Sequence, residues 1–98
     1  MKTLQECLGW HTAYADGHST MESWFDWNDR LMEYTPSTDY LIGWVTDNVL
    51  VSSITYVPAA TPQWVATFQD KNGKSCTEKS TQFRSLLVAI VRTAADEN

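Results

Sequence analysis

The sequence is poor in cysteine, histidine and glycine, and this scarcity excludes several kinds of site. Two cysteines, Cys7 and Cys76, are too few for a disulfide-stapled mini-protein, so we expect both thiols to be free. There is no C-x-x-C pair and only two histidines, so the sequence contains no zinc-binding spacing. The four glycines are isolated from one another, and neither the P-loop nor the dinucleotide-binding fingerprint occurs. We therefore predict no cofactor and no metal.

Long apolar runs are also lacking. The longest, residues 86–91, has six residues, whereas a helix that spans a bilayer needs about 20. The opening segment Thr3-Leu4-Gln5-Glu6 is too polar for the core of a signal peptide. We expect a cytoplasmic protein that does not engage a membrane.

Positive charge is scarce in the first half of the chain. The net charge is −5, and residues 1–49 hold eight acidic and two basic side chains, against four acidic and five basic ones in residues 50–98. Binding to nucleic acid requires a positive face that displaces phosphate counterions, so direct binding to nucleic acid is not expected. The charge instead favours a protein partner with a basic face, including a protein that itself binds nucleic acid.

Hydrophobic and aromatic residues, in contrast, are abundant. They make up 43% of the 98 residues, and five Trp, four Tyr and three Phe are among them. This composition predicts one folded domain over residues 1–98 and excludes a disordered chain. Aromatic side chains fill cores but are also enriched at binding surfaces.

The first half of the chain predicts two helices separated by extended segments. Thr3 and Glu6 have the spacing of a capping box, which predicts a helix over residues 3–9 that ends at Gly9. Residues 10–16 read as extended, and residues 21–34 as an irregular hairpin, with a helix as the alternative. Ser37 caps a second helix at 38–50, in which Gly43 either permits close packing or is simply tolerated.

The second half predicts three antiparallel strands and a helix. Residues 53–57 and 64–69 have strand composition, Asn72-Gly73 forms a hairpin turn, and residues 74–78 return as a polar edge strand. Apolar residues recur at helical spacing from Phe83 to Ala94. We therefore predict an α+β fold, in which a three-to-four-stranded antiparallel sheet packs against three helices like a sandwich.

The segment 22–34 is the candidate contact surface. Its aromatic rings alternate with carboxylates, which suggests an aromatic anchor with an acidic rim, although a hairpin that buries its rings would have the same composition. The predicted partner-binding residues are Glu22, Trp24, Asp26, Trp27, Asp29 and Glu33.

Catalytic interpretations are weaker. His11, Asp16 and His18 could hold a metal, but their spacing matches no known ligand signature. Cys76 with a distant histidine could form a nucleophile pair, yet no orienting carboxylate or oxyanion loop can be identified. We therefore predict no catalytic residues and no enzymatic activity.

Several short segments resemble the phage ABA sandwich domain family of small bacteriophage and prophage proteins. They are Cys7-Leu8-Gly9-Trp10, residues 34–39 (YTPSTD), residues 64–68 (WVATF) and the last helix over residues 80–94. The resemblance implies a sheet sandwiched between helices. It also implies a phage accessory protein that acts in the bacterial cytoplasm, and small acidic proteins of this kind often antagonise host defence.

Two functional hypotheses follow. The first is a phage-encoded acidic binding protein that antagonises a host defence or nucleic-acid-processing complex through segment 22–34. The alternative is a protein that binds or sequesters a small, nucleotide-type ligand in a pocket of Trp and basic side chains such as Arg84, at a subunit interface. The sequence leaves the oligomeric state open.

Overall fold

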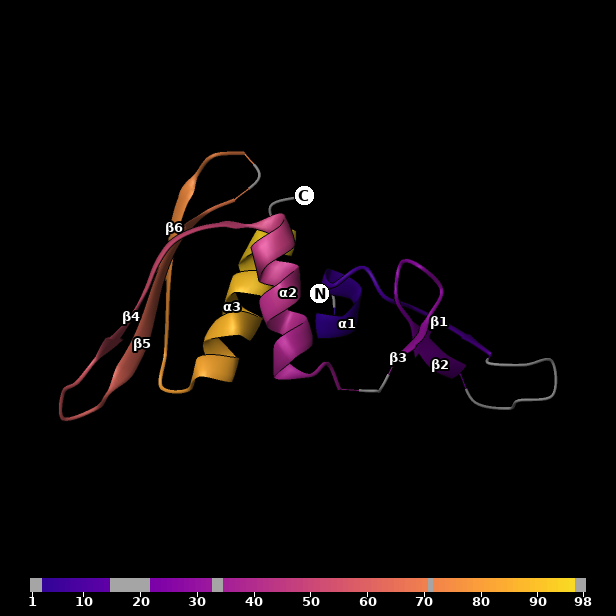
Figure 1. Cartoon of the computed structure of the whole chain (residues 1–98), viewed down its shortest axis with the longest axis horizontal. Coiled ribbons are helices and arrows are strands. Elements are labelled where there is room, and N and C mark those ends of the chain that lie inside the picture. Colours follow the sequence, from indigo (N-terminus) through magenta and orange to yellow (C-terminus); the bar gives the residue numbers. More distant parts are fainter. Residues whose placement is uncertain (1–2, 15–21, 33–34, 71, 97–98) are drawn as a thin grey trace.

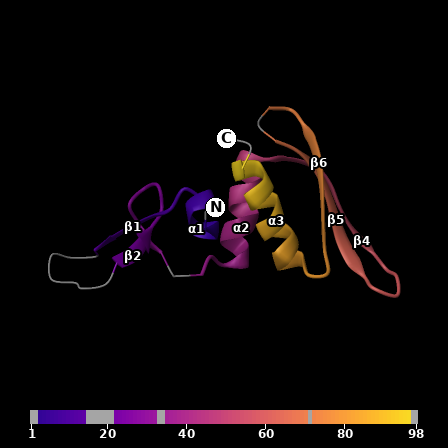
Figure 2. The ribbon, with the colours of Figure 1, turned by 180° about the vertical axis from the view of Figure 1, so that it is seen from behind.

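Three helices lie between two separate antiparallel sheets in the computed structural model of the chain (Figures 1 and 2). The structure describes residues 3–14, 22–32, 35–70 and 72–96. Along the longest axis the order is the large sheet (β4, β5 and β6), α3 and α2, then α1, and finally the small sheet (β1, β2 and β3). The molecule is elongated, at 53 × 31 × 23 Å.

The first two helices begin at the predicted caps. α1 (Leu4–Cys7) starts after Thr3, whose hydroxyl accepts from the Glu6 N–H while the Glu6 carboxylate accepts from the Thr3 N–H. Gly9 follows with φ +86°, the conformation that ends helices. α2 (Thr38–Asn48) starts after Ser37, whose Oγ accepts from the Tyr40 N–H at 3.1 Å. Both helices are shorter than predicted at their carboxyl ends.

α3 (Phe83–Asp96) supplies much of the core. Its spacing places one side of the helix against α1, α2 and the large sheet, and the buried residues are Leu86, Leu87, Ile90, Val91, Ala94 and Ala95. Arg84 lies beside this stripe, and its guanidinium donates to the Pro36 carbonyl and the Thr38 hydroxyl. These two bonds hold the start of α2 against α3.

The large sheet consists of β4 (Leu50–Val57), β5 (Gln63–Gln69) and β6 (Ser75–Ser80), with β5 in the centre. Alternate residues of β5 point to opposite faces, and Ala66 and Phe68 are fully buried on the face toward the helices. β4 begins three residues earlier than predicted, and a register irregularity lies between Val51 and Ser53.

The small sheet consists of β1 (His11–Tyr14), β2 (Glu22–Phe25) and β3 (Leu31–Met32). Over the described residues 10–14 and 22–32 it confirms the predicted extended segment and hairpin, so the helical alternative is wrong there. A contact between Trp10, which directly precedes β1, and Tyr40 of α2 joins the small sheet to the helices: the indole N–H donates to the phenol oxygen at 2.8 Å, and the rings meet edge-on. Trp24 and Met32 also pack on the core.

The predicted α+β class is confirmed, with one addition. The three predicted strands of the second half form a sheet of their own, and the hairpin of the first half forms a second sheet on the other side of the helices. Cys7 is buried in the core, Cys76 is half-buried, and neither forms a disulfide bond. Among the described helices, none is long and apolar enough to cross a membrane.

Candidate binding site

A cleft of about 570 Å³ lies where the small sheet meets the helices. The turn between β2 and β3 forms one wall, one side of α2 forms the other, and the end of α1 closes it. We call it the aromatic cleft, and it is lined by Cys7, Leu8, Gly9, Trp27, Arg30, Tyr40, Gly43, Trp44, Asp47 and Asn48.

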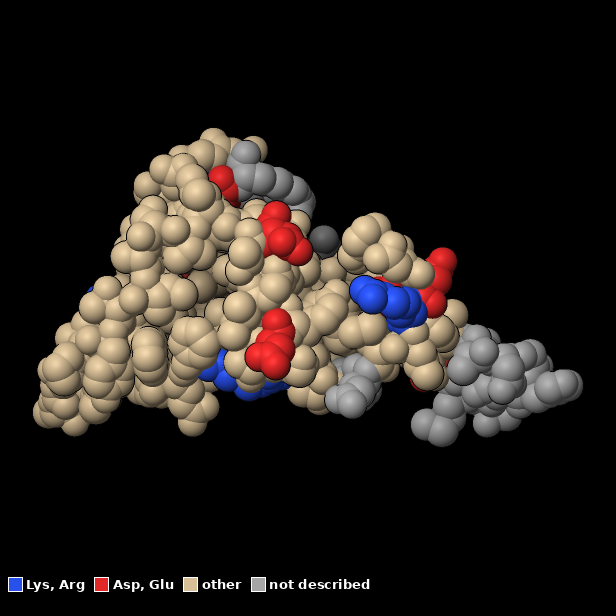
Figure 3. Space-filling model, viewed as in Figure 1, with Lys and Arg blue, Asp and Glu red and all other residues tan. Residues whose placement is uncertain are grey.

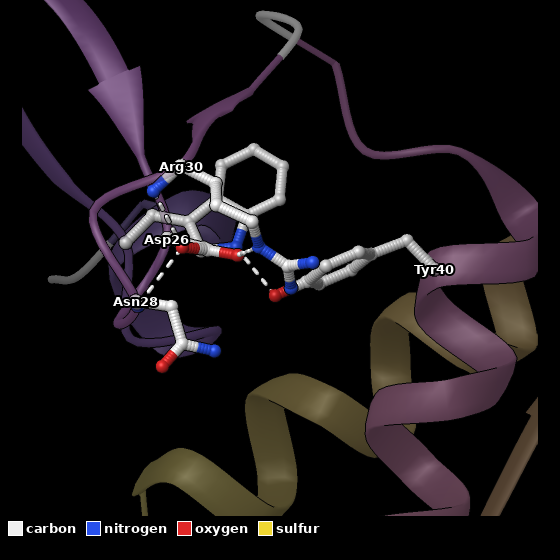
Figure 4. Close-up of polar contacts among 5 residues, drawn as sticks. Asp26, Asn28, Arg30 and Tyr40 are labelled. Atoms are coloured by element: carbon white, nitrogen blue, oxygen red, sulfur yellow. Dashed lines mark hydrogen bonds and ion pairs between the residues drawn. The ribbon is translucent and has the colours of Figure 1, made fainter.

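The first wall is built around the carboxylate of Asp26, in what we call the Asp26 turn (residues 26–30). Oδ1 accepts from the backbone N–H groups of Asn28 and Arg30, each at 2.9 Å, and Oδ2 accepts from Arg30 Nε at 2.9 Å (Figure 4). Two backbone bonds close the same loop, from Asp26 N–H to the Arg30 carbonyl and from Asp29 N–H to the Asp26 carbonyl. The carboxylate thereby sets the shape of the turn.

This bonding keeps Asp26 ionised although its side chain is completely buried. The backbone N–H of Arg30 is the largest influence and lowers the pKa of the Asp26 carboxyl below its ordinary value of 3.8. Burial acts in the opposite direction, but the Asn28 N–H and the Arg30 guanidinium lower this pKa further. At neutral pH the turn therefore holds a fixed carboxylate–guanidinium ion pair.

The Asp26 turn projects Trp27 into solvent. The residue is 74% exposed, although an indole is among the largest apolar groups a protein can bury. Asp29, two positions on, adopts φ +61° and has an 83% exposed side chain, whose carboxylate lies 3.3 Å from the imidazole of His11. The Asp26 turn thus carries an exposed apolar ring that lines the aromatic cleft and, two positions on, a solvent-exposed carboxylate.

The second wall is a stripe along α2. Tyr40, Gly43, Trp44 and Asp47 are spaced i, i+3, i+4 and i+7, so they share one side of the helix. A Cβ atom at Gly43 would meet no atom within 4 Å. The close packing considered for Gly43 is therefore wrong, and this position instead leaves the floor of the cleft open.

The structure separates the predicted contact residues into three groups. Glu22, Trp27 and Asp29 are exposed, whereas Trp24 is half-buried against the core. Asp26 is buried, and its carboxylate is occupied within the turn, so it positions the turn and does not face a partner. Glu33 lies outside the described residues.

Sequence reasoning missed the α2 side of the cleft. The stripe of Tyr40, Trp44 and Asp47 is present in the sequence, and the structure shows that Tyr40 and Trp44 pack partly on the core and also line the cleft. A second apolar stripe next to the core stripe is the signal that would have found it. Arg84, proposed for a ligand pocket, is engaged between α2 and α3, and the basic residue at the cleft is Arg30.

Charge is unevenly distributed around the cleft (Figure 3). Two acidic groups lie over α2, which carries Asp39 and Asp47, and basic and acidic groups lie together over the small sheet. Arg30 is paired with Asp26, and the other charged residue among the described residues that line the cleft is Asp47. The rim therefore favours a positively charged partner.

The residues considered for catalysis are far apart or paired elsewhere. His11 belongs to the small sheet, where it stacks on Phe25, and Cys76 belongs to the large sheet on the other side of the helices. Asp16 and His18 lie outside the described residues. Within the described ranges, no group of three or more His, Cys, Asp or Glu side chains is placed to hold a metal ion.

Comparison with known proteins adds no relative: no protein-family model, no curated protein and no solved structure matches this chain.

Proposed function

We propose that this chain is a small acidic binding protein whose contact surface is Trp27 together with the aromatic cleft. The exposed Trp27 carries the proposal, because a 74% exposed tryptophan leaves a large apolar surface in water unless a partner covers it. Trp27, Tyr40 and Trp44 place three rings around one depression. Buried aromatic anchors at the centre of an interface commonly supply most of its binding free energy.

The acidic rim defines the chemistry of the partner. Asp47 lines the cleft with the aromatic rings, and the exposed Asp29 follows Trp27 by two positions on the Asp26 turn; both carboxylates can pair with Lys or Arg on the opposing surface. A protein that binds nucleic acid presents such a basic face. We therefore propose that the chain antagonises a host defence or nucleic-acid-processing complex by occupying that face.

A phage origin is part of this proposal and is supported by resemblance alone. The segments 7–10, 34–39 and 64–68 resemble small phage and prophage proteins. On this view the chain acts in the cytoplasm of the bacterial host, without a cofactor and without chemistry of its own.

The proposal is tested by capture of a partner from bacterial lysate with the wild-type chain and with Trp27→Ala. Trp27 makes up little of the core, so the variant should keep the wild-type melting temperature while losing the partner. Leu50→Ala is the matched control, because Leu50 is 66% exposed but lies on the large sheet. Equal recovery of the partner by Trp27→Ala and wild type would refute this contact surface.

The cleft itself favours a second candidate function, the binding of a small planar ligand. Its volume of about 570 Å³ falls in the range of small-molecule sites, and it combines aromatic rings with the Arg30 guanidinium. If a nucleotide-type ligand binds here, nucleotides should raise the melting temperature of the wild-type chain but not that of Gly43→Phe, whose ring would fill the floor. An unchanged melting temperature across a nucleotide panel would remove this candidate.

A further inference from the structure

The outer edge of the large sheet is an unprotected strand. Among the described residues β4 pairs with β5 alone, so the backbone groups on its other edge have no strand partner. Four large apolar residues of β4 are exposed: Leu50 at 66%, Ile54 at 38%, Tyr56 at 47% and Val57 at 43%. Natural proteins usually protect such an edge with lysine, proline or an inward charge, because a free edge pairs with other strands.

β4 has none of these protective residues. No proline or charged residue occurs within it, and the whole stretch of residues 48–69 contains no charged side chain. The register irregularity between Val51 and Ser53 interrupts only its beginning, and the pairing of residues 53–57 with β5 is regular. Five consecutive residues are therefore available for pairing along the free edge.

This neutral stretch contrasts with the rest of an acidic chain. Two copies with a net charge of −5 repel each other overall. At β4 they can approach without bringing like charges together, whereas a basic partner would find no carboxylate there to pair with. The charge pattern therefore favours a second copy of the same chain over a charged partner.

The sequence of β4 is also complementary to itself. If two β4 strands pair antiparallel around Thr55, Ser53 lies opposite Val57, Ile54 lies opposite Tyr56, and Thr55 lies opposite its own copy. Pairs of a β-branched with an aromatic residue, and threonine pairs, are among those that stabilise antiparallel strands. Each such dimer contains the Ile54–Tyr56 pair twice.

This register also keeps the faces of the sheet matched. Ile54 and Tyr56 lie opposite Ala66 and Trp64 on β5, and therefore on the face that packs against the helices. Tyr56 continues a row of rings, with centroids 5.1 Å from Trp64, which in turn lies 5.2 Å from Phe83. Pairing around Thr55 joins two such rows on the same face of one six-stranded sheet.

We propose that the chain forms a two-fold symmetric dimer through β4, with residues 53–57 of the two copies paired antiparallel around Thr55. The contact is isologous, since the same five residues serve both copies, and it closes after two subunits. β4 lies on the other side of α3 and α2 from α1 and the small sheet, so the dimer contact leaves the residues that line the aromatic cleft uncovered. The inference is independent of the proposed function.

The first test measures the mass of the full-length chain by sedimentation equilibrium over a range of concentrations. We expect a monomer–dimer equilibrium for the wild type, and a monomer for Thr55→Lys, in which two ammonium groups would meet on the two-fold axis. Thr77→Lys is the matched control, because Thr77 is an exposed threonine on the same outer face of the sheet but on β6. A wild-type chain that stays monomeric at all concentrations, or a Thr55→Lys dimer, would overturn the proposal.

The second test examines the register and uses Cys76→Ser as background. Directly opposite residues of an antiparallel pair have Cβ atoms about 4.5–5.5 Å apart, close enough for oxidative cross-linking. Thr55→Cys should therefore form a disulfide-linked dimer under mild oxidation. Ser53→Cys should not do so alone, but should link to Val57→Cys when the two variants are mixed. If Ser53→Cys formed a cross-linked homodimer more readily than Thr55→Cys does, this pairing would be contradicted.

Discussion

The carboxylate of Asp26 illustrates how one side chain can shape a binding surface without touching a partner. It binds two backbone N–H groups and one guanidinium, and through them it fixes the loop that carries Trp27. Asp70 binds its turn in a similar way: its Oδ1 accepts from the N–H groups of Asn72 and Lys74. The two turns differ at Oδ2, which accepts from Arg30 in Asp26 but in Asp70 has no hydrogen-bond partner among the described residues, and at the fourth position, which is an exposed aspartate in the Asp26 turn and Gly73 in the other.

The lowered pKa of Asp26 predicts a specific response to acid. A carboxyl whose pKa is lower in the folded than in the unfolded chain stabilises the fold fully above its unfolded value near 3.8. That contribution is lost as the pH falls through the lower, folded pKa. We therefore expect Asp26→Asn to lower the urea midpoint at neutral pH, and the difference from wild type to shrink below pH 3.8.

Urea unfolding at several pH values, followed by tryptophan fluorescence, measures this difference. Asp39→Asn is a suitable control, since Asp39 is exposed in the first turn of α2 and lies outside the Asp26 turn. A difference between Asp26→Asn and wild type that stays constant down to strongly acidic pH would contradict the role assigned to the ionised carboxylate.

Two sides of the helix α2 make contacts, one with the core and one with the aromatic cleft. Leu41 and Val45 face the core, whereas Tyr40, Gly43 and Trp44 face the aromatic cleft. At positions that line the cleft, the residue is therefore not always the one that would stabilise the helix most. Gly43 is the clearest case, because glycine inside a helix costs about 1 kcal/mol relative to alanine.

Gly43→Ala should therefore raise the free energy of unfolding by about 1 kcal/mol, because the added methyl group meets no atom within 4 Å. Gly73→Ala is the matched control: its Cβ also meets nothing, but its φ is +81°. That change should destabilise the chain by about 1 kcal/mol, since an L-residue is strained there. Equal effects of the two variants in urea unfolding would show that backbone conformation does not determine the outcome.

The arrangement of two sheets around one helical layer implies unequal stability along the molecule. The large sheet packs against α3 and buries Ala66 and Phe68. The small sheet has strands of only four, four and two residues and joins the helices through Trp10, Trp24 and Met32. Short strands with few buried contacts open locally at a lower free energy.

Amide hydrogen exchange should reveal this difference. We expect the N–H groups of β5 to exchange only on global unfolding, and those of β1 and β2 to exchange many times faster. Trp10→Phe removes the hydrogen bond to Tyr40, which contributes about 1 kcal/mol, and should accelerate exchange in the small sheet far more than in β5. Equal protection of the two sheets would indicate that they unfold as one cooperative unit.

The sequence by itself determined the features that depend on neighbouring residues. The capping box at Thr3, the cap at Ser37, the turn at Asn72-Gly73 and the apolar stripe of α3 all rest on short spacings in the sequence. Hydrogen bonds and periodicities of this range are encoded locally, and these elements were predicted; the hairpin around the Asp26 turn was predicted, but the turn's hydrogen bonds were not.

Only the tertiary structure decided where these elements meet. The bond from Trp10 to Tyr40 joins residues 30 positions apart, and the aromatic cleft combines α1, the Asp26 turn and α2. No local spacing determines that Trp24 packs on the core while Trp27, three positions on, stands in water. Burial depends on what lies across from a side chain, and that is set by the packing of distant segments and not by the residue's neighbours in the sequence.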